Sequence, residues 1–272
     1  MSPIVDSHLH VWSEDRQQYP RSDTPYRAPV ELLLDYLDEA GVDHAVIVLP
    51  MYYRYDNRIL ADTLRAYPRR FAGVGVIDPR GPDAAGRLHR LVHEDGIRGV
   101  RLRATIEEDA FTPEATDALW RAATELRVPV CLLGRPQHVR AMRAMVERHP
   151  EAITVIDHFA NIPAADGVQS EPFRTFLSLA EFPNVYIKLS GLHYWGGGRY
   201  PYPLARPLIR AALDAFGPAR TMWGSDWPHV LFGCGYIRCL NFVRRELPWL
   251  SKDERAQILG GTALKLWSFD YP

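Results

Sequence analysis

The sequence contains few cysteines. Only Cys131, Cys234 and Cys239 occur in 272 residues. They are too few and too irregularly spaced for a disulfide framework, and the spacing of Cys234 and Cys239 matches no common zinc pair. A fold held together by disulfides is therefore excluded, and we expect a protein of the reducing cytoplasm.

An excess of charge of either sign is also missing. The chain has 32 lysines and arginines against 33 aspartates and glutamates, which leaves a formal net charge of -1. Such a balance creates no field that would attract the phosphates of nucleic acid or an anionic lipid surface. We therefore expect a small-molecule substrate, with neither nucleic acid nor a membrane as a partner. A homo-oligomer is compatible with the sequence, which does not determine the oligomeric state.

Long apolar runs are absent as well. No stretch approaches the roughly 18 apolar residues of a membrane-spanning helix, and the opening MSPIVDSHLH lacks the pattern of a signal peptide. The 22 prolines are scattered, as in loops and helix starts, and mark no linker. Because no internal boundary or repeat stands out, we expect one domain over residues 1–272.

Short runs rich in Val, Ile and Leu recur along the chain, with segments of helical period between them. Continuous apolar runs are typical of strands buried on both faces of a parallel sheet. The predicted strands cover residues 3–5 (continuing to His10), 44–49, 71–77, 97–102, 128–133, 153–156, 184–189 and 220–223. Eight strands alternating with helices favour an α/β fold of the closed (β/α)8 TIM-barrel type over an open doubly wound sheet.

Several helix ends are marked by the residues around them. An amphipathic segment begins at Val30 and is expected to end at Gly41, because glycine suits a helix C-terminus. Thr112 followed by Pro113 is typical of a helix start. Residues 251–254 (SKDE) resemble a capping box before the last helix.

Two histidines end the first predicted strand. His8 and His10 are separated by one residue, so both side chains point to the same face. The active sites of such barrels lie at the C-terminal ends of the strands, and imidazole is a good ligand for zinc and similar metals. The pair therefore indicates the start of a metal site, the alternative being two polar residues packed at a loop. Other histidines are expected to be structural (His44) or solvated (His89, His93 and His149).

Two further polar residues follow later strands. His158 comes after ITVID at the end of the sixth predicted strand, and Asp226 comes after RTMWGS at the end of the eighth. Because the C-terminal ends of the strands meet at one mouth, His8, His10, His158 and Asp226 are expected to converge. An aspartate at this place can bind a metal and accept a proton from water, although it could also merely cap the following turn.

Five segments together resemble the amidohydrolase-related group of the amidohydrolase superfamily. They are DSHLHVW, GVRLR, IDHFA, NVYIKLSG and MWGSDWPH, in that order over nearly the whole chain. Within this group the chain resembles the branch of sugar-acid and pyrone-dicarboxylate lactonases, with acyl-muconate-type decarboxylases as more distant relatives. The resemblance implies a barrel enzyme whose catalytic residues include Asp226 and His158. It also implies one divalent metal ion, zinc or manganese, on His8, His10, His158 and Asp226, or a metal-free reaction at the same residues.

The chain departs from the family pattern in three places. No histidine stands at the tip of the fifth strand, so that ligand is missing unless His138 reaches back. Arg101 and Arg103 occupy the fourth strand, where binuclear hydrolases carry a bridging lysine, which argues against a binuclear site. Glu107 stands where the dicarboxylate lactonases carry a second arginine, and Asn161 follows the strand-six histidine, which disfavours a substrate with two or three carboxylates and favours a mono-acid or a largely neutral lactone or amide.

Four residues are expected to contact the substrate. Arg101 matches the arginine that binds a substrate carboxylate in the lactonases, the alternative being a surface salt bridge. Lys188 points into the lumen or toward the barrel wall, depending on a register that the sequence does not determine. His193 lies in the aromatic and glycine-rich segment 192–200, which forms a wall over the substrate or a plain surface loop. Tyr52 follows the second strand and lines the mouth or only covers it.

These residues support three hypotheses about function. The first is hydrolysis of a lactone or a related acyl compound, with Asp226 as general base and the histidines polarising the carbonyl. The second is non-oxidative decarboxylation of a small unsaturated or aromatic acid. The third, a non-catalytic binding protein, is disfavoured because all four centre positions hold chemically competent residues.

Overall fold

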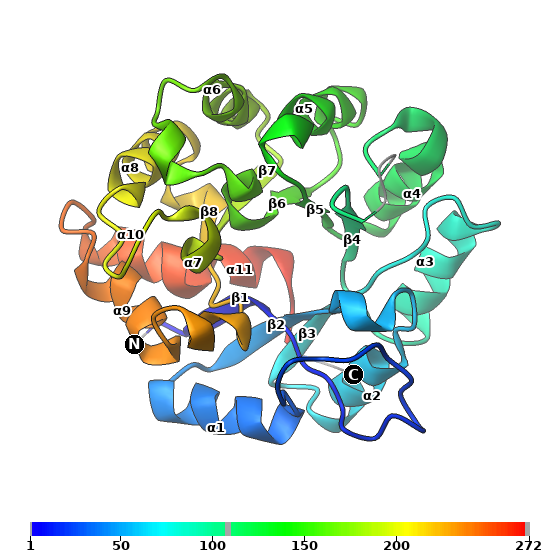
Figure 1. The fold of residues 1–272 in the computed structure, drawn as a ribbon. Helices are drawn as coiled ribbons and strands as arrows, with labels where there is room; N and C mark the ends of the chain where they lie inside the picture. The colour runs from blue at the N-terminus through cyan, green and yellow to red at the C-terminus, as the bar shows by residue number, and fades with distance from the viewer. Residues whose placement is uncertain (1, 107–109, 270–272) are drawn as a thin grey trace.

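The computed structural model describes residues 2–106 and 110–269, which form eight parallel strands with helices between them (Figure 1). All eight predicted strands are confirmed, each to within a few residues of its expected ends. The strands are Val5–Leu9 (β1), His44–Val48 (β2), Phe71–Val74 (β3), Val100–Arg103 (β4), Val130–Leu133 (β5), Thr154–Ile156 (β6), Val185–Leu189 (β7) and Thr221–Trp223 (β8).

The helices lie around the outside of the strands (Figure 1). They are Val30–Ala40 (α1), Arg58–Ala66 (α2), Ala84–His93 (α3), Pro113–Leu126 (α4), Val139–Arg148 (α5), Glu171–Ser178 (α6), Leu192–Trp195 (α7), Ala205–Phe216 (α8), Tyr236–Arg245 (α9), Lys252–Ala256 (α10) and Thr262–Leu266 (α11). Short 3-10 turns occur at Met51–Tyr53, Pro136–His138, Ala164–Asp166, Leu179–Glu181, Pro218–Arg220 and His229–Phe232, and a π turn at Gln257–Gly261. None of the described helices is long and apolar enough to cross a membrane.

The expected helix ends are present. Helix α1 ends at Gly41, whose φ of 66° is a left-handed conformation that glycine adopts at low cost. Helix α4 begins at Pro113, with Thr112 in extended conformation before it. Ser251 and Glu254 form the capping box: the Ser251 Oγ accepts from the Glu254 N–H, and the Glu254 carboxylate accepts from the Ser251 N–H.

The strands form two parallel ladders that are joined at two seams. The ladders run in the order β1-β2-β3 and β4-β5-β6-β7-β8. At the first seam the Arg101 N–H donates to the Gly75 carbonyl at 2.8 Å. At the second, the Asp226 N–H donates to the His8 carbonyl and the His10 N–H to the Trp227 carbonyl, both at 2.8 Å. These bonds complete the (β/α)8 barrel, and the second seam places Asp226 directly beside the two histidines of β1.

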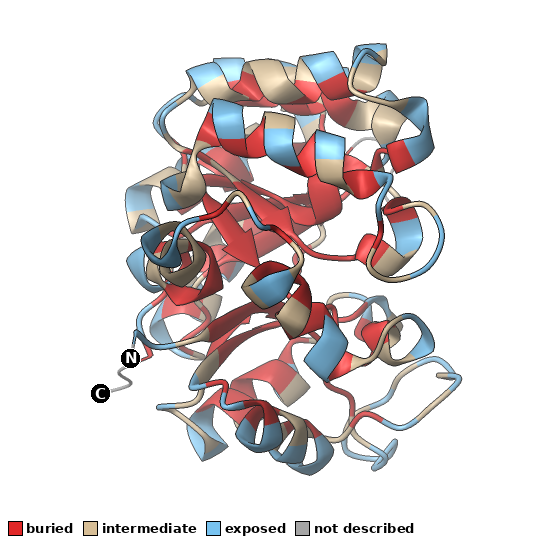
Figure 2. Cartoon of the chain, turned by 90° about the vertical axis from the view of Figure 1, so that its left-hand side faces the viewer, coloured by how far each residue is buried: buried red, intermediate tan, exposed pale blue. Residues whose placement is uncertain are grey.

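Apolar side chains fill the lower part of the barrel. Alternate positions of most strands point inward, as the two-residue period of a strand requires, whereas the pairing register of β1 shifts between Asp6 and Leu9. The inward-facing residues are Val5, Val46, Val48, Ala72, Val74, Cys131, Val155 and Met222. Trp267 and Phe269, which follow α11, pack against them at the N-terminal end, while the other face of each strand packs against the helices (Figure 2). The polar groups of the strand ends are thus left at the opposite, C-terminal mouth.

Candidate active site

Four predicted residues meet at the C-terminal mouth of the barrel around one carboxylate oxygen. The Oδ1 of Asp226 lies 3.3 Å from the Nε2 of His10, 3.7 Å from the Nε2 of His8 and 3.9 Å from the Nε2 of His158. All four side chains are buried. The arrangement gives one buried carboxylate facing three imidazoles.

Left-handed backbone turns aim two of these side chains. His158 has a φ of 54°, and the three residues after it share this conformation, which is uncommon for residues other than glycine. Asp226 also lies in this region, with a φ of 61°. Gly191 permits the close approach, because a Cβ at this position would lie 2.8 Å from the Nδ1 of His158. The sharp turns after β6 and β8 thus direct both side chains over the mouth.

The hydrogen bonds of His10 constrain its tautomer. Its Nδ1 lies 2.7 Å from the carbonyl oxygen of Val48, so Nδ1 carries a proton and donates it. In the neutral ring, the lone pair of Nε2 then faces the Asp226 carboxylate at 3.3 Å. Two hydrogen-bond acceptors in this position need a proton or a metal ion between them.

The same residues have the composition of a metal site. Ligand atoms of His8, His10 and Asp226 all lie within 4.8 Å of one another. The Nε2 of His8 and the Oδ2 of Asp226 are buried without a hydrogen-bond partner among the described residues. Orphaned imidazole nitrogen and carboxylate oxygen fit a divalent metal such as zinc. His158 lies beside this group through its contact with Asp226.

A buried charge cluster supports His8 from below. Asp157 accepts from the Nε of Arg101 at 2.8 Å and lies 3.1 Å from the Nζ of Lys188. The Nζ of Lys188 is also 3.2 Å from the Nδ1 of His8. Lys188 faces the lumen and not the barrel wall, because its Nζ lies 5.5 Å from the ring of Trp267 inside the barrel. Its side chain is fully buried beneath His8 and lies outside the described lining of the cavity.

The electrostatics favour an ionised Asp226 carboxylate beside the neutral imidazoles of His8 and His158. Burial raises the pKa of Asp226, but the neighbouring His158 and His10 outweigh this effect and hold the pKa below its ordinary value. Burial lowers the pKa of His158 to about 4 and that of His8 well below its ordinary value. Asp226 can therefore accept a proton at neutral pH.

A cavity of about 150 Å³ opens above this centre. Arg101 and Tyr52 lie in its wall together with His10, His158 and Asp226. Its remaining lining residues are Pro50, Met51, Arg103, Ile106, Leu133, Asn161, Tyr194 and His229. Arg101 is buried and bound to Asp157, so the alternative of a surface salt bridge is wrong.

His193 reaches the centre from the segment after β7. Its Nε2 lies 3.5 Å from the Oδ2 of Asp226, and burial lowers its pKa. The segment around it thus forms a wall of the site and is not a plain surface loop.

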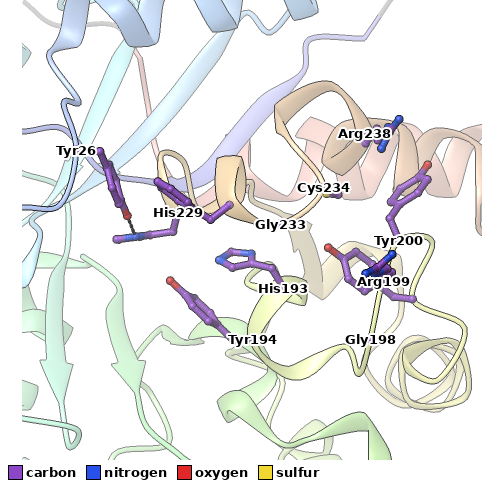
Figure 3. A pocket seen from close by; sticks show the side chains of 12 residues that line it. Tyr26, His193, Tyr194, Gly198, Arg199, Tyr200, His229, Gly233, Cys234 and Arg238 are labelled. Atoms are coloured by element: carbon purple, nitrogen blue, oxygen red, sulfur yellow. Dashed lines mark hydrogen bonds between the residues drawn. The ribbon is translucent and has the colours of Figure 1, made fainter.

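Three residues at the site were not singled out from the sequence. Asp157 precedes His158 in the IDHFA segment, and His229 closes the MWGSDWPH segment, so the motifs themselves held the signal. The ring of His229 lies 5.5 Å from that of His10. Its Nδ1 shares a short hydrogen bond with the hydroxyl of Tyr26 (Figure 3). Tyr26 comes from the segment between β1 and α1, where no local pattern marks it.

The other histidines lie away from the centre. His138 accepts from the Arg135 N–H at 3.1 Å and so completes its own turn without supplying a fifth-strand ligand. His44 is structural, as expected, and stacks on Phe269. His149 is not simply solvated, because it stacks on Trp120 and lies 2.8 Å from Asp117. Glu107, where the sequence was expected to differ from the dicarboxylate lactonases, lies outside the described residues.

Comparisons with known proteins agree with this geometry. A family model described as amidohydrolase matches residues 5–269. The L-fucono-1,5-lactonase of Burkholderia ambifaria is 31% identical over 284 residues, which covers 98% of this chain and 96% of that protein. A putative 2-pyrone-4,6-dicarboxylic acid hydrolase from Pseudomonas putida superposes with a TM-score of 0.83 at 27% identity, covering 100% of both chains. An amidohydrolase from Burkholderia multivorans with bound zinc superposes with a TM-score of 0.79 at 26% identity, covering 97% of this chain and 99% of that one.

Proposed function

The chain belongs to the amidohydrolase family, and on that premise we propose that it is an enzyme that hydrolyses a lactone to the open hydroxy acid. One observation carries the proposal: the buried Asp226 carboxylate, ionised at neutral pH, faces three imidazoles at the floor of a cavity. Its similarity to two proteins named for lactone or pyrone hydrolysis supports the choice of substrate. The three free cysteines among the described residues fit the cytoplasmic location that we also propose.

Asp226 acts as the general base. It accepts a proton from water, and the water oxygen bonds to the carbonyl carbon of the lactone. Of the imidazoles, those of His8 and His158 can donate a hydrogen bond to the oxygen that gains negative charge, whereas the Nε2 of His10 presents a lone pair. When the tetrahedral species collapses, the ring C–O bond breaks and the leaving alkoxide takes the proton held by Asp226. The product is an open chain that carries a carboxylic acid and a hydroxyl group, and Asp226 returns to its ionised form.

A single divalent ion, zinc or manganese, fits the residues present. His8, His10 and Asp226 would hold it, with His158 beside them, because their ligand atoms lie within 4.8 Å of one another and the His8 Nε2 and Asp226 Oδ2 have no hydrogen-bond partner among the described residues. When bound, such an ion acts as a Lewis acid that polarises the carbonyl. The chain's own part is to hold the ring of His10 through Val48 and that of His8 through Lys188.

Other residues position the substrate. Arg101 has its Nε committed to Asp157, and its side chain lies in the cavity wall, where we propose that it binds a carbonyl or carboxylate oxygen. Tyr52 contributes an aromatic wall, and its ring is held 5.1 Å from that of Trp12. His193 lies 3.5 Å from the Oδ2 of Asp226 and lines a neighbouring cavity that shares Tyr194 and His229 with this one.

The proposal is tested with Asp226→Asn on a panel of γ- and δ-lactones, followed by acid release at constant pH. The substitution keeps the shape and removes the base, so kcat should fall by about a hundredfold or more while KM changes little. Asp214→Asn, an exposed change on α8, is the matched control and should retain full activity. Near-native hydrolysis by Asp226→Asn would remove Asp226 from the mechanism. Release of carbon dioxide from aromatic acids without turnover of any lactone would favour the decarboxylase hypothesis instead.

A further inference from the structure

Two of the three cysteines lie together at the start of helix α9. Cys234 stands two residues before the helix, and Cys239 lies in its first turn. The Cys239 N–H donates to the carbonyl oxygen of Gly235 at 3.1 Å, so Cys239 lies one helical turn from the residue that follows Cys234. Both thiols are free, and they share a hydrogen bond with each other. The proposed hydrolysis uses neither of them.

We propose that Cys234 and Cys239 form an oxidation site: hydrogen peroxide oxidises Cys234, Cys239 then closes a disulfide with it, and the disulfide lowers turnover. The oxidation itself is independent of the substrate. Only its effect on turnover rests on the proposed lactone hydrolysis.

The two thiols differ in their access to solvent, as the two steps of such an oxidation require. Cys234 is partly exposed and lines a cavity of about 610 Å³, which shares Tyr194 and His229 with the reaction cavity (Figure 3). Cys239 lies behind it and is only 6% exposed. An accessible thiol next to a second, resolving thiol is the arrangement of redox-sensitive cysteines. A small peroxide can therefore reach Cys234 from the cavity.

The surroundings of Cys234 favour its reactive, ionised form. Hydrogen bonds from the Cys239 thiol and the Tyr202 hydroxyl outweigh burial and lower the pKa of Cys234 to about 7. Arg238 adds a nearby positive charge, and the positive end of the α9 dipole lies next to Cys234. The contact with Cys234 and burial raise the pKa of Cys239, which therefore keeps its proton. The more accessible sulfur is thus the nucleophile.

The oxidation takes two balanced steps. The Cys234 thiolate attacks one peroxide oxygen, the O–O bond breaks, and the leaving hydroxide becomes water with the proton that the thiol released. This step gives a sulfenic acid on Cys234. The Cys239 sulfur then attacks the Cys234 sulfur, the S–S bond forms, the S–O bond breaks, and the leaving hydroxide takes the Cys239 proton. In total, two thiols are oxidised to one disulfide, and one peroxide is reduced to two waters.

Glycines on both sides of Cys234 permit the movement that a disulfide requires. The two sulfurs must approach from a hydrogen-bonded contact to bonding distance. Gly233 and Gly235 flank Cys234, and Gly235 has a φ of 80°, which glycine adopts at low cost. The segment can therefore shift without moving the body of α9.

A shift of this segment would reach the reaction centre. Gly233 packs closely on His193, because a Cβ at Gly233 would lie 2.6 Å from the Cβ of His193. The Nε2 of His193 in turn lies 3.5 Å from the Oδ2 of Asp226. On the other side, the Sγ of Cys239 lies 4.0 Å from the carbonyl oxygen of Ser225, which precedes Asp226. A misplacement of about 1 Å can lower a rate by about 100-fold, so we expect oxidation to lower kcat by about tenfold.

The test treats the purified enzyme with increasing hydrogen peroxide at pH 7, then denatures it in iodoacetamide and measures the masses of its tryptic peptides. Cys234 and Cys239 fall on separate peptides, because Arg238 stands between them. We expect both to disappear from the alkylated pool together and to return as one cross-linked pair that dithiothreitol separates. Cys131 is the internal control: it is fully buried, burial raises its pKa to about 12, and it should remain a thiol.

Two variants separate the steps. In Cys239→Ala the oxidation should stop at a sulfenic acid on Cys234, which dimedone traps. In Cys234→Ser, Cys239 should remain a thiol, and kcat on a lactone should survive the peroxide treatment. The kcat of the wild-type enzyme should fall by about tenfold as the cross-link forms and recover with dithiothreitol.

A Cys234 that remains a free thiol, or a Cys131 that is lost as fast as Cys234, would overturn the oxidation site. An equal loss of kcat in Cys234→Ser, or a wild-type kcat that is unchanged when the cross-link is complete, would overturn its effect on turnover. If no lactone is hydrolysed, the peptide masses still decide whether the pair is oxidised. Failure of the proposed reaction and failure of the oxidation site are therefore distinguishable.

Discussion

Lys188 offers a sharp test of the charge cluster beneath the active site. Its Nζ is fully buried, 3.1 Å from the Oδ1 of Asp157 and 3.2 Å from the Nδ1 of His8. Lys188→Met keeps a long, unbranched side chain and removes the charge. The Asp157 carboxylate then loses one of its two cations, and His8 loses the neighbour that holds its ring.

The expected loss of stability follows from the contacts that remain. Removing one partner of a buried ion pair costs about 3–5 kcal/mol. Arg101 still donates to the Oδ2 of Asp157 at 2.8 Å, so the loss should be near the lower end, about 3 kcal/mol. At about 2–4 °C per kcal/mol, Tm should fall by about 6–12 °C. Because His8 is no longer held, kcat should also fall by about 10- to 100-fold, the scale for losing a partner of a ligating histidine.

The pH dependence of this effect has a definite sign. Burial raises the pKa of Asp157, but Lys188 and Arg101 outweigh it and hold the pKa well below the ordinary 3.8. A lowered carboxyl pKa stabilises the fold above the pKa of the unfolded chain, and this contribution is lost as pH falls through the folded pKa. Lys188→Met raises the folded pKa of Asp157. The stability difference between wild type and variant should therefore be largest near neutral pH and shrink below about pH 4.

The measurement is urea unfolding of both proteins at several pH values, together with kcat on a lactone substrate. Lys265→Met, an exposed lysine on α11, is the matched control and should change stability by less than about 0.5 kcal/mol. If Lys188→Met unfolded within the same margin and kept its kcat, the cluster would not support His8 and the reasoning would be refuted.

Three further predictions concern the cavity and the turns around it. Arg101→Met should raise KM far more than it lowers kcat, because a contact to a non-reacting group supplies mainly uniform binding; steady-state kinetics showing a collapse of kcat at constant KM would place it at the reacting centre. Burial lowers the pKa of His158 to about 4, and the pKa of Asp226 lies below its ordinary value. We therefore expect kcat to rise with pH and to level off by about pH 6. A rise of kcat centred above pH 7 would contradict this prediction. Gly191→Ala should lower both Tm and kcat, because the added Cβ would lie 2.8 Å from His158. Gly217 also has a positive φ but has nothing within 4 Å of a Cβ, so Gly217→Ala should lower Tm alone. Equal kcat in the two variants would argue against the contact with His158.

The sequence by itself determined the strands and the core of the site. Apolar runs such as residues 44–49 identify buried parallel strands, because both faces of the strand are covered. The single residue between His8 and His10 fixes their common face through the two-residue period of a strand. Asp226 and His158 follow apolar runs, and the barrel rule places such residues at one mouth.

Only the tertiary structure decided how these residues are held and what surrounds them. Lys188 faces inward because the register of β7 in the closed barrel puts it there, and local alternation is equally compatible with either face. Tyr26 reaches His229 across 203 positions of sequence, a contact that no local pattern marks. Patterns in a sequence report the period of one element, whereas pairing, tautomers and cavities depend on contacts that form when distant elements close the barrel.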